Sequence, residues 1–75
     1  MILMVTSANY LGGHTLLCTF SNGETRKVDL THLLEEPAYE ELKDENEFIR
    51  YGVDGTVFWA NGSDIAPEYL YEHGV

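Results

Sequence analysis

Cysteine is almost absent from this 75-residue sequence, in which Cys18 is the only one. A single thiol forms no internal disulfide and no cysteine-rich zinc cluster. The histidines are His14, His32 and His73, and no two of them have the i, i+4 spacing of a metal-binding pair on a helix. We therefore expect Cys18 to be a small apolar residue of the core and each histidine to be an exposed polar residue. We expect neither a metal nor a cofactor.

Lysine and arginine are scarce as well: four of them stand against 13 acidic residues, and the formal net charge is -9. Binding to a nucleic-acid backbone depends on basic side chains that displace counterions. Direct nucleic-acid binding is therefore not expected, and anionic membrane surfaces are disfavoured for the same reason. The charge fits a basic partner protein, or simple solubility.

The sequence contains no long apolar run. Its first residues, MILMV, are far too few for a membrane span, and no basic residues precede them as they would in a signal peptide. We therefore expect a cytoplasmic protein. Hydrophobic residues make up 44% of the chain, a share typical of a folded domain, and the length predicts a single domain over residues 1–75.

Strand patterns fill the first 30 residues. Residues 2–6 form an apolar run suited to a strand, and turn-forming residues follow at 9–13. Residues 14–20 and 25–30 alternate between two faces, and the Asn22-Gly23 dipeptide between them is typical of a tight hairpin turn. These patterns predict a three-stranded antiparallel meander. The first alternating stretch places Leu16, Cys18 and Phe20 on one face and Thr15, Leu17 and Thr19 on the other.

Helical signals occupy the middle of the chain, and strand signals return after them. Leu33 and Leu34 lie in a short helical turn, and Pro37 suits the first turn of a longer helix that ends near residues 43–46. A strand is expected from Phe48 onward, and a tight turn at Asp54-Gly55 leads to a returning strand over residues 56–60.

The last part of the chain changes character at Asn61-Gly62, which breaks the strand. Ser63 or Asp64 is expected to cap a short terminal helix over residues 68–72. The predicted order is then β-β-β-α-β-β-α, which indicates an α+β domain with a small antiparallel sheet and helices packed on the sheet.

Trp59 is the only tryptophan and lies beside this strand–turn–helix junction. An indole buries a large area and needs a partner for its N–H group. We interpret Trp59 as a buried anchor for the terminal helix, with Leu70 packed inward beside Ile65, rather than as a surface on which a ligand stacks.

The carboxylates are the remaining source of chemistry. Seven of the thirteen lie between Glu35 and Glu47, on the polar face of the predicted helix, where solvated groups do no acid–base work. Asp29, Asp54 and Asp64 lie instead at predicted strand ends. They support an alternative hypothesis: a small-molecule or metal-binding protein, enzymatic or not, that uses strand-end carboxylates. Asp64 is also a candidate for a partner surface.

The segment Val57–Tyr71, read as W-x-N-G-x-D-I-x-P-x-x-L-Y from Trp59, resembles a bacterial family of domains of unknown function, number 2442. Val28-Asp29-Leu30 and the Tyr39, Leu42 and Phe48 spacing extend the resemblance over nearly the whole chain, whereas Glu36 departs from the small residue common there. The signature residues carried over are Trp59, Asn61, Gly62, Asp64, Ile65, Pro67, Leu70 and Tyr71.

The resemblance implies a small α+β domain with no established activity. Members of the family occur alone, joined to a helix-turn-helix domain, or encoded beside a second short protein in an arrangement similar to toxin–antitoxin pairs. At this length, we expect no helix-turn-helix domain in this chain.

Our first hypothesis is therefore a non-enzymatic interaction or regulatory module, antitoxin-like in the broad sense, that binds a protein partner. The contact surface is expected either on the sheet face of Thr15, Leu17 and Thr19 or at the aromatic edge of Tyr69 and Tyr71. Self-association into a homodimer through an uncovered strand edge is a third hypothesis.

Overall fold

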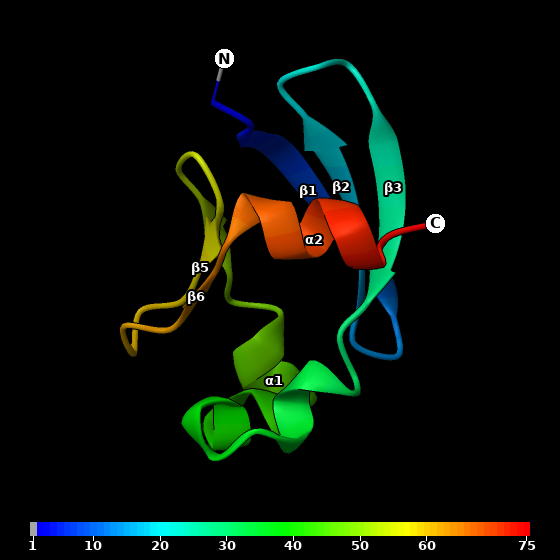
Figure 1. Ribbon diagram of the computed structural model, residues 1–75. Helices are drawn as coiled ribbons and strands as arrows, with labels where there is room; N and C mark the ends of the chain where they lie inside the picture. The colour runs from blue at the N-terminus through cyan, green and yellow to red at the C-terminus, as the bar shows by residue number, and fades with distance from the viewer. Residues whose placement is uncertain (1) are drawn as a thin grey trace.

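A computed structural model describes residues 2–75. Its first sheet is an antiparallel meander in the order β1-β2-β3, as the sequence predicts (Figure 1). The strands are β1 (Val5–Gly12), β2 (Thr15–Phe20) and β3 (Thr25–Asp29).

The first strand lies later in the chain than predicted. Residues 9–12, expected to form a turn, continue β1, and Asn9 pairs with Leu17 of β2. The turn is confined to Gly13 and His14, whose φ angles are 59° and 57°. Two residues with positive φ are enough to reverse the chain. The polar Asn9 is therefore not needed for the turn and pairs within the sheet.

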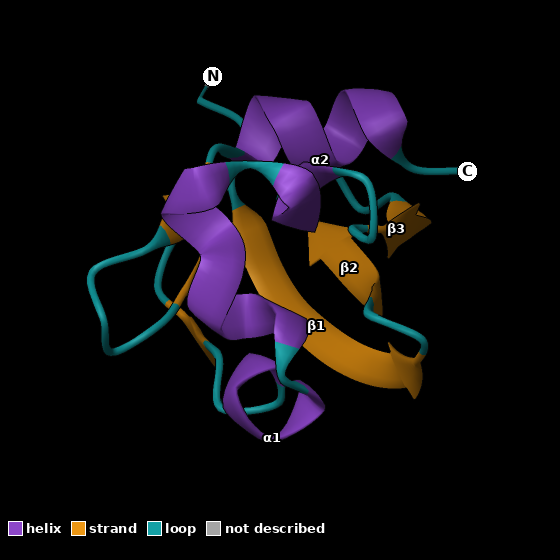
Figure 2. Ribbon diagram, turned by 90° about the horizontal axis from the view of Figure 1, so that it is seen from below, coloured by secondary structure: helices purple, strands orange, loops and turns teal. Residues whose placement is uncertain are grey.

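One face of this sheet forms the core, as the alternation predicts. Leu16, Cys18, Phe20 and Val28 are all buried beneath the helices, which lie to one side of the first sheet (Figure 2). Burial raises the pKa of the Cys18 thiol to about 11, because the charged thiolate is poorly solvated there. The expected role of Cys18 as an apolar core residue is confirmed.

The helical segment is more broken than predicted. It consists of η1 (Leu33–Glu35), η2 (Pro37–Lys43), both 3₁₀ helices, and α1 (Glu45–Phe48). Asp44 has extended backbone angles, φ -72° and ψ 117°, and its side chain accepts a hydrogen bond from the Asn46 N–H. This N-cap ends one helix and starts another.

Phe48 therefore lies at the end of α1 and not at the start of a strand, so that prediction is wrong. Its side chain is fully buried, with 0% exposure. The fourth strand begins only at Gly52. The alternation of Ile49, Tyr51 and Val53 suggested an earlier start, but Ile49 has helical angles and caps the end of α1.

A second antiparallel sheet has the order β4-β5-β6. The strands are β4 (Gly52–Val53), β5 (Val57–Phe58) and β6 (Asp64–Ile65). The hairpin at Asp54-Gly55 is as predicted, whereas β6 was not expected. Phe58 is 41% exposed, and its ring lies so close to Gly52 that a Cβ on that residue would come within 2.7 Å of it.

The chain ends with α2 (Pro67–His73), which crosses one face of the first sheet (Figure 1). Leu70 is buried beneath it, as predicted. The cap prediction is wrong: the N-cap is Ala66, with no side-chain hydrogen bond. After the helix, Val75 exchanges two backbone hydrogen bonds with Lys27, of 2.9 and 3.0 Å, along the outer edge of β3.

His14 and Phe48 join the helical segment to the first sheet. The His14 Nε2 donates to the Lys43 carbonyl at 3.0 Å, and its ring meets the Phe48 ring edge to face at 4.9 Å. His14 is half-buried rather than exposed as expected, because this contact covers one face of its ring.

Replacement of Phe48 by alanine tests whether this contact supports the fold. We expect Phe48→Ala to lower the free energy of unfolding by about 3–5 kcal/mol, against a total of about 4–11 kcal/mol for a chain of this length. Phe58→Ala, a matched control at an exposed position, should cost about 1 kcal/mol or less. Urea unfolding measures both, with Phe48→Leu as the milder variant if Phe48→Ala does not fold. Equal losses at the two positions would contradict this assignment.

Candidate functional site

Trp59 has 3% exposure and donates its indole N–H to the Phe48 carbonyl at 2.9 Å. The two rings lie 5.6 Å apart, tilted by 45°. The buried role of Trp59 is confirmed. The element it contacts differs from the prediction, because the hydrogen bond and the ring contact go to α1 and not to the terminal helix.

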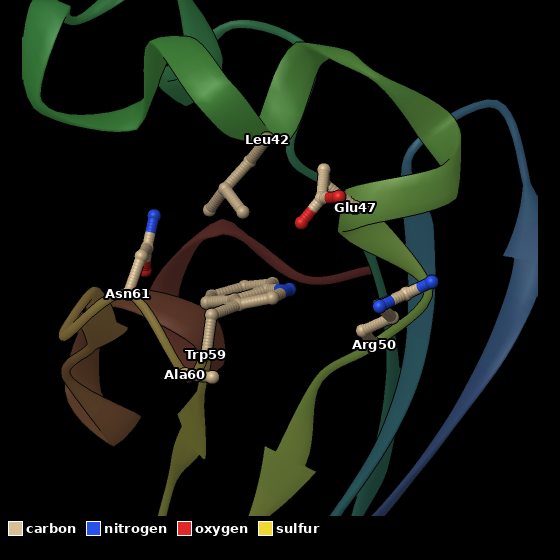
Figure 3. Close-up of a pocket in the computed structure, with 6 residues that line it drawn as sticks. All are labelled: Leu42, Glu47, Arg50, Trp59, Ala60 and Asn61. Carbon is tan, nitrogen blue, oxygen red and sulfur yellow. The ribbon is translucent and has the colours of Figure 1, made fainter.

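A small hollow opens beside the Trp59 ring (Figure 3). Its volume is about 100 Å³, well below the roughly 300–1,000 Å³ of a pocket for a drug-sized ligand. It is shared by η2, α1 and the turn after β5. The residues that line it are Leu42, Glu47, Arg50, Trp59, Ala60 and Asn61.

Glu47 and Arg50 bring charge to one end of the hollow. Both side chains are exposed, and neither forms an ion pair with another residue in the described range 2–75. At the other end, the Asn61 amide donates to Glu41 Oε2 at 3.4 Å. The hollow thus has an apolar middle with one carboxylate and one guanidinium among its lining residues, and Glu41 lies next to it through its contact with Asn61.

The turn between β5 and β6 places two signature residues at this rim. Asn61 Oδ1 accepts a hydrogen bond from the Ser63 N–H at 2.9 Å, and the Gly62 N–H donates to the Trp59 carbonyl at 3.1 Å. Gly62 has a φ of 94°, which favours glycine. Asn61 and Gly62 are therefore explained by the turn that follows Trp59.

Four further signature residues support the strand and helix after this turn. Ile65 and Leu70 are buried, and Pro67 occupies the first turn of α2. Asp64 lies in β6 with an exposed side chain, and its backbone carbonyl accepts a hydrogen bond from the Tyr39 hydroxyl at 3.0 Å.

Tyr71, the last signature residue, lies in a clasp formed by Glu24, Arg26 and Tyr71. The Tyr71 hydroxyl donates to Glu24, and the Arg26 guanidinium lies 3.7 Å from the Tyr71 ring centroid. Arg26 also donates to the Tyr71 carbonyl at 2.7 Å and pairs with Glu24 at 3.1 Å. The clasp fastens α2 to the hairpin between β2 and β3.

The two expected partner surfaces lie on opposite sides of the first sheet. Thr15, Leu17 and Thr19 are half-buried on the face away from the helices, whereas Tyr71 packs on Phe20 at 5.2 Å on the core side. Tyr69 stacks on His73 at 3.9 Å. Both tyrosines thus already have partners within the chain.

The three strand-end carboxylates lie on different elements and give no evidence of a common site. Asp29 ends β3, Asp54 lies in the hairpin after β4, and Asp64 lies in β6. A hydrogen bond from the Thr31 N–H lowers the pKa of the Asp29 carboxyl. Across residues 2–75, no group of three or more His, Cys, Asp or Glu side chains is placed to hold a metal ion.

Glu47 and Arg50 were not predicted from the sequence as neighbours of Trp59. A signal for the first was present: Asp44 is followed three residues later by Glu47, a pattern typical of a helix N-terminus. This pattern predicts a helix that begins at Asp44, with Glu47, Phe48 and Arg50 around its last turn.

In the part of the chain that the structure describes, no helix is long and apolar enough to cross a membrane.

The clasp predicts a specific dependence of stability on pH. The Tyr71 hydroxyl, and then the Arg26 guanidinium, donate to Glu24 and hold the pKa of its carboxyl below the ordinary value. A carboxylate with a lowered folded-state pKa stabilises the fold above its unfolded pKa, about 4.3, and this contribution is lost as pH falls through the folded-state pKa. We expect Glu24→Gln to lower the melting temperature at pH 7, and the gap to wild type to narrow as pH falls below about 4.3.

Thermal unfolding followed by circular dichroism from pH 7 to pH 3 measures this gap. Glu68→Gln is the matched control, because Glu68 is an exposed acid on α2, outside the clasp. A gap that stays constant with pH would show that the Glu24 charge contributes nothing.

Comparison with known proteins gives one match. The model of the family described as protein of unknown function (DUF2442) matches residues 5–75, which confirms the resemblance noted in the sequence. No curated protein and no solved structure matches the chain.

Proposed function

The chain belongs to the DUF2442 family, and from that premise we propose that it is a non-enzymatic module that binds a basic protein partner. The role is regulatory and antitoxin-like in the broad sense, in that the partner's activity is restrained by the bound module. The proposal includes a bacterial, cytoplasmic setting, in which an unpaired thiol such as Cys18 is ordinary.

The observation that carries the proposal is the acidic segment, residues 35–47. Its one base, Lys43, pairs with Glu40 at 3.7 Å. Such a concentration of one charge steers a partner of opposite charge and raises the rate of association. The acids of this segment are Glu35, Glu36, Glu40, Glu41, Asp44, Glu45 and Glu47, and all are exposed.

Folding holds this segment in place although its helices are short. The Tyr10 hydroxyl donates to Glu45 Oε2 at 2.5 Å, and His14 binds the Lys43 carbonyl. The acids are therefore presented on a positioned backbone, which lowers the entropy lost when a partner binds.

The face of the first sheet opposite the helices supports a second contact of mixed polar and apolar character. Leu17 lies at its centre, with Asn9 and Lys27 as cross-strand neighbours, and Leu11 is 50% exposed. We favour this face over the edge of Tyr69 and Tyr71, because those two rings already pack within the chain.

Formation of a homodimer through a strand edge has less support. Val5 of β1 donates to the Gly55 carbonyl at 2.9 Å, and the Tyr51 hydroxyl donates to Ala8 at 3.0 Å. Lys27 of β3 is paired with Val75. Both edges of the first sheet thus bond to other parts of the chain.

Affinity capture from the native host, and co-expression with the product of the neighbouring gene, test the proposal. We expect a stoichiometric partner at low salt and its loss at high salt, where charges are screened. A variant with Glu35, Glu36, Glu40 and Glu41 changed to glutamine should lose most of the partner. The matched control changes the same number of acids elsewhere, namely Asp54, Asp64, Glu68 and Glu72, to the corresponding amides.

The two variants have the same net charge. Equal retention of partner by both would show that capture reflects overall charge and not the acidic segment. Absence of any stoichiometric partner at low salt would refute the proposed function itself.

A further inference from the structure

We infer that the hollow beside Trp59 is a binding site for one cationic side chain, an arginine or a lysine, of the partner protein. The inference rests on the proposed function. It adds the place at which the partner binds and the chemistry of that contact. Three observations carry it: the shape of the hollow, the charges at its rim and its place in the acidic segment.

The hollow suits the aliphatic stem of a long side chain. Leu42 lies across the opening from the Trp59 ring, and Ala60 adds a methyl group beside it (Figure 3). Lysine and arginine bury their methylene stems against apolar surface while the charged end stays near water. A volume of about 100 Å³ is too small for a drug-sized ligand.

The charges at the rim suit the cationic end. Glu47 lines the hollow and forms no ion pair with any residue from 2 to 75, so its carboxylate is available. Glu41 does not line the hollow, but it contacts the lining residue Asn61 and adds negative charge nearby. Trp59 is only 3% exposed, so it contributes apolar lining to the hollow and no open aromatic face for the cation.

Arg50 is the one base at this rim, and its side chain is exposed. It therefore opposes a cationic occupant and favours an anionic one. An anion, however, would approach a chain with a formal net charge of -9, at a hollow that the acidic segment partly lines through Leu42 and Glu47. Charge complementarity thus favours the cation, and the sign of the Arg50 effect decides between the two.

Trp59 fluorescence tests the site directly, because the chain has a single tryptophan and it lines the hollow. The probe is an acetylated, amidated hexa-arginine peptide, with hexa-glutamate for comparison. We expect a saturable change in fluorescence with hexa-arginine alone. Glu47→Gln should weaken its binding about two- to fivefold more than Glu72→Gln does, and Arg50→Gln should strengthen it about twofold.

Glu72→Gln is the matched control, because it removes one exposed charge from α2, which contributes no residue to the lining. Equal effects of Glu47→Gln and Glu72→Gln would overturn the inference, since binding would then follow overall charge. Saturable binding of hexa-glutamate that Arg50→Gln abolishes would overturn it in favour of an anion site. A fluorescence signal unchanged by hexa-arginine would overturn it as well.

These outcomes are separable from those of the proposed function. If the chain captures a stoichiometric partner while Glu47→Gln behaves as Glu72→Gln does, the hollow is not the binding site for the partner. The protein-binding role then stands. If hexa-arginine binds at Trp59 but no partner is captured, the site is real and the proposed function is wrong.

Discussion

The packing of Phe48 against Trp59 is the contact on which the rest of the fold depends. Phe48 lies at the end of α1 and meets Tyr10 and His14 of the first sheet at 5.6 and 4.9 Å. On its other side it meets Trp59, which follows β5 of the second sheet, and its carbonyl takes the indole N–H. Two small sheets and a broken helical segment thus share one aromatic cluster. Each aromatic ring in such a cluster buries about 150–250 Å², a large share for a chain this short.

This contact explains why the helical segment is ordered although its local structure is weak. Its 3₁₀ helices and a four-residue α-helix are far shorter than the roughly 12–15 residues that an isolated helix needs. Tertiary contacts must therefore hold it. Leu34, Leu42 and Phe48 point inward while the acids between them face water. The segment that carries most of the acidic residues is thus held by buried apolar side chains.

Local patterns predicted the parts of the fold whose signals are local. Asn22-Gly23 and Asp54-Gly55 marked real hairpins, and the alternation around Cys18 assigned the buried face correctly. Phe48 was misassigned because Ile49, Tyr51 and Val53 satisfy period two whether or not a strand is formed. The β6 strand has only two residues, too few for any period.

The sequence predicted only the part of the candidate site that comes from one local segment. Trp59 and Asn61 were singled out from their own segment, whereas Leu42, Glu47 and Arg50 come from another. They meet Trp59 only because α1 ends in a buried Phe48, so an error in that one residue concealed the site.

Charge and shape contribute differently to binding at an acidic surface. A dense row of acids raises the rate of association with any basic protein, and this increase becomes smaller as the salt concentration rises. Selection among basic partners requires geometry, because specificity is a difference in affinity between partners. The inferred site beside Trp59, an apolar hollow with the Glu47 carboxylate at its rim, is the part of the proposal that supplies such geometry. A shallow hollow of this size is therefore more informative about function than the net charge that surrounds it.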